Sequence, residues 1–134
     1  CVYCKAASAV LDMLWESPTA RDQFAALGAD LSTLGPLVHE VFVPAYCQFK
    51  NQQDVATLAR LDAEISNELL APYYEKPTFK EIWADWGDST RGAFMREQFE
   101  AKLAIVLTRY NGDALLKGYT AAYSAYLQKH PARH

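Results

Sequence analysis

The sequence has 134 residues, of which 51% are hydrophobic and 22% are charged, and its formal net charge is −3. This length suits a single domain with a real core, and the composition excludes a disordered chain. No apolar run approaches the roughly 20 residues of a membrane-spanning helix, and no basic stripe of the kind that binds nucleic acid is present. We therefore expect one helical domain over residues 1–134, without a transmembrane segment and without a nucleic-acid partner.

Residue choice favours helix along the whole chain. Alanine occurs 21 times and Leu 15 times, whereas Val and Ile together occur 10 times. Unbranched side chains lose little freedom in a helix, and β-branched ones suit strands better. Gly and Pro, six of each, fall where helices would start or stop. The predicted fold class is all-α, a single-domain irregular or orthogonal bundle of six to seven helices.

Two helices are predicted at the start of the chain. Residues 2–16 place their apolar side chains on one face at helical spacing. Ser17 is a good N-cap, and Pro18 is tolerated in a first turn because its missing N–H would be unpaired there anyway. The second helix then continues to about Leu27 and ends at Gly28.

The stretch from residue 30 to residue 50 is ambiguous. Its apolar residues are not confined to one face, which suits a buried helix or a short buried strand. Pro44 must kink or restart any helix that reaches it, because its ring and its missing N–H break the hydrogen-bond ladder. We predict two short helices here, over residues 34–43 and 45–50.

Longer helices are predicted over residues 53–70, 90–110 and 113–129, with a short helix beginning at Pro77. The segment 90–110 is apolar on two sides, which is typical of a helix near the centre of the fold. Asn111 and Gly112 end it, and the connection to the last helix is short. The last two helices are therefore expected to pack as antiparallel neighbours.

Three cysteines leave several interpretations open. Cys1 and Cys4 have the C-x-x-C spacing of a redox couple, half a metal site or a haem attachment. If Cys1 carried a lipid anchor, Cys4 and Cys47 would remain to form a disulfide in a periplasmic or secreted protein. The alternative is that Cys4 and Cys47 are small buried side chains, as in a cytoplasmic protein. The candidate metal ligands are few and scattered, so we expect no metal and no other cofactor.

Three tyrosines form an apolar stripe on the last predicted helix. Tyr119, Tyr123 and Tyr126 share one face and combine an apolar ring with a polar tip. They indicate either a core whose hydroxyls reach its rim or an aromatic pocket for a ligand.

Asp62 is an unusual residue for its position. It falls in the middle of the apolar stripe of the helix at 53–70. A buried carboxylate is costly unless it is paired or hydrogen-bonded. Asp62 is therefore expected either to pair with Arg91, Arg96 or Arg109, or to contact a ligand.

His39 is the one histidine away from the C-terminal end of the sequence. Between apolar neighbours it indicates a packed side chain or a ligand contact. Together with Cys47 it could act as a nucleophile–base pair only if the fold brought the two residues together.

The sequence contains no phosphate loop, dinucleotide fingerprint or histidine-based metal motif, which argues against an enzyme. We expect a non-enzymatic binding module that holds a small amphipathic ligand or a partner protein on its tyrosine-rich face. The alternative function is a thiol-based redox, metal-binding or haem-binding protein that uses Cys1, Cys4 and Cys47.

Overall fold

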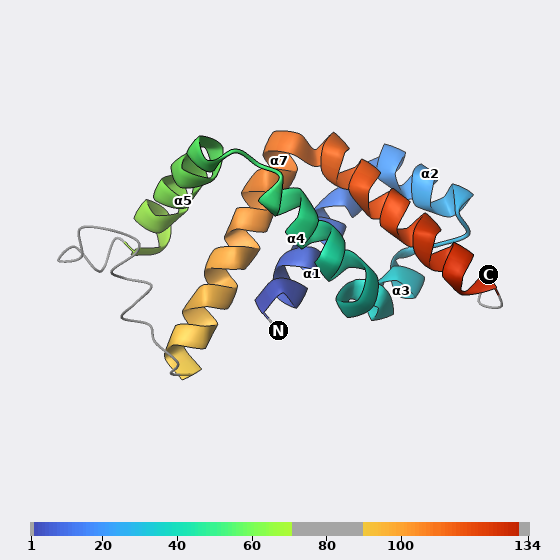
Figure 1. The fold of residues 1–134 in the computed structure, drawn as a ribbon, viewed down its shortest axis with the longest axis horizontal. Coiled ribbons are helices and arrows are strands. Elements are labelled where there is room, and N and C mark those ends of the chain that lie inside the picture. Colours follow the sequence, from blue (N-terminus) through green and yellow to red (C-terminus); the bar gives the residue numbers. More distant parts are fainter. Residues whose placement is uncertain (1, 71–89, 132–134) are drawn as a thin grey trace.

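The computed structural model describes residues 2–70 and 90–131, and every regular element in these ranges is helical (Figure 1). In chain order the elements are α1 (Val2–Trp15), α2 (Pro18–Ala26), α3 (Leu31–Leu34), the 3-10 turn η1 (Gly35–Leu37), the π turn η2 (Val38–Phe42), α4 (Val43–Asn51), α5 (Val55–Leu70) and α7 (Thr90–Lys129).

The first two helices follow the boundaries that the sequence predicts. The face of α1 that carries Ala7 and Leu11 is buried, as helical spacing requires. Pro18 stands at the first turn of α2, and Gly28 follows the helix with a φ of 79°. This left-handed conformation is one that Gly adopts without steric cost, so the chain can turn sharply there.

Between α3 and α4 the chain changes from α-helix to 3-10 turn, then to π turn, and then back to α-helix. Asp30 and Thr33 form a capping box that starts α3, and η1 and η2 follow without a break. In η2 the N–H of Val43 donates to the carbonyl oxygen of Val38, which makes the turn one residue wider than an α turn. This wide turn comes directly before Pro44, whose ring would clash with the carbonyl four residues earlier in a regular α-helix. The two separate helices predicted here are one continuous helical run.

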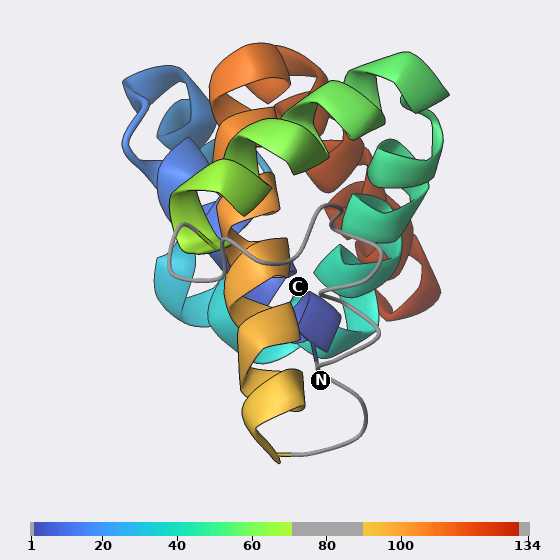
Figure 2. The same ribbon diagram turned by 90° about the vertical axis from the view of Figure 1, so that its left-hand side faces the viewer.

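The helix α5 begins just after Asp54, whose carboxylate accepts a 2.8 Å hydrogen bond from the backbone N–H of Thr57. This side chain satisfies one of the donors that the first turn of a helix leaves free. Leu61 and Ile65 are buried on the inner face of α5. Figure 2 shows α5 crossing the first half of α7, against which it packs.

The element α7 consists of two helices joined at a kink, at the position where the sequence predicts that one helix ends and the next begins. Asn111 has non-helical angles, φ −144° and ψ 46°, and the chain resumes the helix at the next residue. The chain changes direction abruptly at this residue, and the two halves of α7 spread apart from the bend (Figure 1). The predicted break at Asn111 is confirmed, whereas the predicted antiparallel packing of the two halves is wrong, since they diverge from the bend (Figure 1). The expected inward orientation of Tyr119, Tyr123 and Tyr126 is confirmed.

Aromatic rings form the centre of the core between α1, α2, η2 and the second half of α7. Phe42 stacks on Tyr119 with ring centroids 4.8 Å apart, and Phe24 meets both Phe42 and Tyr123 edge-on at 6.5 Å. Such pairs contribute beyond the area that they bury, about 0.5–1.5 kcal/mol each. These contacts hold the second half of α7 against α2 and η2.

The all-α class is confirmed, since the described residues contain no strand. Five of the described helices have nine or more residues, whereas the sequence predicted six to seven helices. The helix predicted from Pro77 lies outside the described residues, and the irregular or orthogonal bundle stays a prediction. None of the described helices has the length and apolar character needed to cross a membrane.

Candidate binding groove

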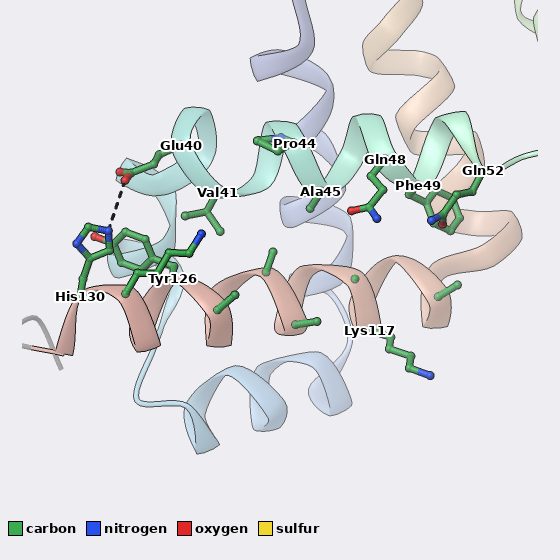
Figure 3. Close-up of a pocket in the computed structure, with 16 residues that line it drawn as sticks. Glu40, Val41, Pro44, Ala45, Gln48, Phe49, Gln52, Lys117, Tyr126 and His130 are labelled. Carbon is green, nitrogen blue, oxygen red and sulfur yellow. Dashed lines mark ion pairs between the residues drawn. The ribbon is translucent and has the colours of Figure 1, made fainter.

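A groove of about 860 Å³ lies between α4 and the second half of α7 (Figure 3). The two helices run side by side in opposite directions, so the groove extends from Glu40 at one end to Gln52 at the other. Its volume is within the roughly 300–1,000 Å³ of typical ligand sites.

The α7 wall of the groove includes a stripe of small residues. Its members, spaced so that they face one side of the helix, are Ala114, Gly118, Ala121, Ala122 and Ala125. Ala121 and Ala125 are exposed to solvent in the open groove. Small residues leave the backbone of α7 accessible, so an occupant can approach it closely.

The opposite wall and the floor provide larger groups. Gln48 and Gln52 of α4 are exposed and offer amide donors and acceptors, whereas Val41 and Phe49 are buried and form an apolar floor. The groove is therefore apolar at its base and polar at its edge, which is the pattern of an amphipathic binding site.

Charged side chains lie at the ends of the groove. Nε2 of His130 is 4.0 Å from Oε1 of Glu40, and the ring of His130 packs on Tyr126 at 4.5 Å (Figure 3). Lys117 and Lys129 are exposed on the α7 side. The two lysines give the α7 edge of the groove a positive charge.

Of the three tyrosines predicted to form a ligand face, Tyr126 alone lines the groove. Tyr119 is fully buried, and its hydroxyl donates a 2.9 Å hydrogen bond to the carbonyl oxygen of Ala7. Burial raises the pKa of Tyr119 well above its usual value and also raises that of Tyr123. Tyr123 and Tyr126 also line a smaller cavity of about 370 Å³ beside Gly28.

A buried polar cluster, which the sequence analysis did not identify, joins α4 to the first half of α7. Glu100 is 5% exposed; Lys50 Nζ lies 2.8 Å from its Oε1, and the hydroxyl of Tyr46 donates to its Oε2 at 3.0 Å. Burial, followed by the negative charge of Glu100, raises the pKa of Tyr46 far above its usual range. A signal was present, because Glu100 precedes Leu103 and Leu107 by three and seven residues and so shares their apolar face of the helix.

Asp62 lies half-buried on α5 and close to this polar cluster. Its pKa is raised by burial and then by the charge of Glu100, whereas Lys50 acts in the opposite direction. Among the described side chains, Arg96 and Arg109 form no ion pair with Asp62, and the side chain of Arg91 lies outside them. A pair with Arg91 and a contact with a ligand both stay predictions.

His39 contacts a cysteine, but not the one considered in the sequence analysis. Its Nδ1 lies 3.3 Å from Sγ of Cys4, which brings α1 and η2 together. The predicted disulfide between Cys4 and Cys47 is wrong, since both are free thiols. Cys4 faces an imidazole instead, and Cys47 is half-buried beside Lys50 and Glu100, where burial raises its pKa.

Within the described residues, no three or more His, Cys, Asp or Glu side chains gather in a group that could hold a metal ion. Comparison with protein-family models, with curated proteins and with solved structures finds no match to this chain.

Proposed function

We propose that the chain is a non-enzymatic binding module that holds an amphipathic helix of a partner protein in the groove between α4 and α7. The observation that carries the proposal is the groove itself, an open channel with an apolar floor and one wall of small residues. Of the tyrosine stripe, the groove uses Tyr126, because Tyr119 and Tyr123 belong to the core.

The dimensions of the groove support a helix as the occupant. From Glu40 to Gln52 the wall is about 18 Å long at the rise of an α-helix. Over that length, its 860 Å³ corresponds to a mean cross-section of about 48 Å², roughly half that of an α-helix with its side chains. A helix would therefore lie half-embedded, with its apolar face on Phe49 and its polar face in solvent, which is a common mode of peptide recognition.

The charge of the groove favours an acidic edge on the partner helix. Lys117 and Lys129 are exposed on the same helix and are separated by about 18 Å. Carboxylates on the partner helix could face both lysines at once. Exposed pairs of this kind contribute only about 0.2–1 kcal/mol each, so they select the orientation more than they supply affinity.

The test is a selection of displayed helical peptides of about four turns, the length of the groove. The target is the full chain, and the comparison is the variant Ala121→Arg, which fills the groove from an exposed position. Ala59→Arg is the matched control, because Ala59 is exposed on α5 outside the groove. Selected peptides should carry an apolar stripe with acidic residues on one side, and should bind the Ala59→Arg variant as well as the unchanged protein.

Two results would contradict this function. Peptides that bind the Ala121→Arg variant with unchanged affinity would place the site elsewhere, and failure to enrich any amphipathic helix would exclude the proposed partner class. In the second case, the probe would be laurate, followed by the amide signals of Ala121 and Ala125 in NMR spectra. A saturable shift at those residues would identify a small amphipathic ligand as the occupant.

A further inference from the structure

The side chains of Cys4 and His39 form a thiol–imidazole pair outside the groove. Cys4 Sγ lies 3.3 Å from His39 Nδ1, although the two residues are 35 positions apart in the chain. We propose that this pair is a thiol–disulfide exchange site, at which Cys4 attacks a small disulfide and His39 accepts the thiol proton. Activation of a cysteine by an adjacent base is the usual way in which proteins make a thiol nucleophilic.

The π turn supports a functional role for this pair. Such turns are rare in proteins, and they occur frequently at functional sites. Here the wide turn η2 carries His39, which is exposed to solvent, to the half-buried Cys4 on α1. A small disulfide in solution therefore has access to the sulfur atom, and the imidazole is held beside it by the backbone of η2.

The charged residues next to the pair have partners of their own. Lys5 follows Cys4 in α1, and its Nζ lies 3.7 Å from Oε2 of Glu97 on α7. Glu40 follows His39 in η2 and faces His130 at 4.0 Å. The imidazole of His39 is thus the group in hydrogen-bonding distance of the Cys4 thiol that can take up its proton.

The second described cysteine lacks such a base and serves as an internal comparison. Cys47 is half-buried, and burial raises the pKa of its thiol, an effect that the charge of Glu100 increases and that of Lys50 opposes. A thiol held in its protonated form is a poor nucleophile, because the thiolate is the reactive species. Cys4 and Cys47 should therefore differ in reactivity although both are free.

The exchange reaction needs no reagent other than the small disulfide, which is the oxidant. The proton of the Cys4 thiol passes to Nδ1 of His39, and the sulfur attacks one sulfur atom of the disulfide. The disulfide bond breaks while a mixed disulfide forms on Cys4, and the second sulfur leaves as a thiolate that takes the proton back. Cys4 is oxidised, and the released thiol is the reduced product.

A neutral pyridyl disulfide is the probe, because each exchange releases a coloured thiopyridone. All proteins carry Cys1→Ser, so that Cys4 and Cys47 are the remaining thiols of the full chain. Near pH 7 Cys4 should react at least about tenfold faster than Cys47, and His39→Gln should lower the rate of Cys4 while leaving that of Cys47 unchanged. Peptide mapping shows which cysteine reacts in each kinetic phase. Glu64→Gln is the control, since Glu64 is exposed on α5 outside the groove and the thiol pair, and it should leave both rates unchanged.

The pH profile separates proton transfer from a packing effect. Without a base, the rate of an ordinary thiol rises about tenfold per pH unit below roughly 8.5. The rate of Cys4 should vary less steeply with pH than that of a thiol without a base, and His39→Gln should restore the steep profile. The proposal is overturned if Cys4 and Cys47 share one profile in the presence of His39, or if His39→Gln leaves the Cys4 rate unchanged. Binding of helical peptides is measured independently, so the groove and the thiol site can fail separately.

Discussion

The hydroxyl of Tyr119 donates a 2.9 Å hydrogen bond to the carbonyl oxygen of Ala7, which joins α7 to α1 across 112 positions of the chain. Both residues are fully buried. The same ring stacks on Phe42 at 4.8 Å, so one side chain connects three elements of the core. A buried hydroxyl with a partner stabilises the fold, whereas the same group without one would cost free energy.

Tyr119→Phe should lower the free energy of unfolding by about 1 kcal/mol, the usual net contribution of one hydrogen bond. The ring and its stacking on Phe42 remain, so a larger loss is not expected. Urea unfolding followed by circular dichroism measures the change. Tyr110→Phe is the control, because Tyr110 is 60% exposed, and its value should stay within about 0.5 kcal/mol of the unchanged protein. Equal effects of the two substitutions would show that the bond contributes nothing.

Lys50→Met should destabilise the protein by about 3 kcal/mol, because it leaves the buried carboxylate of Glu100 without its cation. The matched control Lys117→Met removes an exposed lysine in the groove and should cost less than about 0.5 kcal/mol. Denaturant midpoints at one pH compare the two variants. Adding Glu100→Gln to Lys50→Met should recover part of the loss, and no recovery would mean that the lysine stabilises by packing alone.

Asp62→Asn should raise the stability at neutral pH and leave it nearly unchanged near pH 3. The pKa of Asp62 is raised above its usual 3.8 by burial and by Glu100, so the folded chain binds this proton more tightly than the unfolded chain does. Its contribution to stability is present below about pH 4 and is lost as the pH rises through the folded-state pKa. Thermal unfolding from pH 3 to pH 7 checks this. Destabilisation at pH 7 would show instead that the charged carboxylate makes a favourable contact.

Gly118→Ala should raise the free energy of unfolding by about 0.5–1 kcal/mol, since Gly is unfavourable inside a helix and the added methyl meets no atom within 4 Å. The contrasting variant is Gly28→Ala, which also meets no atom but requires a φ of 79°. It should lower stability by about 1 kcal/mol. Chemical denaturation of both variants measures the difference, and a gain of stability in Gly28→Ala would contradict the left-handed turn after α2.

The sequence predicted the parts of the fold that depend on local chemistry. Helical spacing identified the buried face of α1, and Pro18 and Gly28 marked the ends of α2, because each residue acts through its own backbone. The inward stripe of Tyr119 and Tyr123 followed from spacing in the same way. The break at Asn111 was also identified, but not the direction in which the chain continues, since the same residue types can bend a helical chain or reverse it.

The site could not be predicted to the same extent, because it depends on contacts between distant segments. Cys4 contacts His39 only because α1 packs on η2, and the spacing of residues in the sequence could not predict this contact. The groove likewise arises where α4 and α7 run side by side. The argument that singled out Asp62, a carboxylate within an apolar stripe, could also have identified Glu100. It could not have identified the partner of Glu100, because Lys50 lies 50 positions away in the sequence.

A π turn holds one residue more than an α turn, so η2 should be sensitive to the deletion of a single residue. Loss of a single codon after position 39 and before Pro44 would return the segment to ordinary α-helical geometry. The residues on the two sides of the deletion would then rotate by about 100° relative to each other. Either His39 would leave Cys4 or the wall of the groove would turn away from α7. The thiol pair and the groove thus share one register, and a one-residue indel could not preserve both.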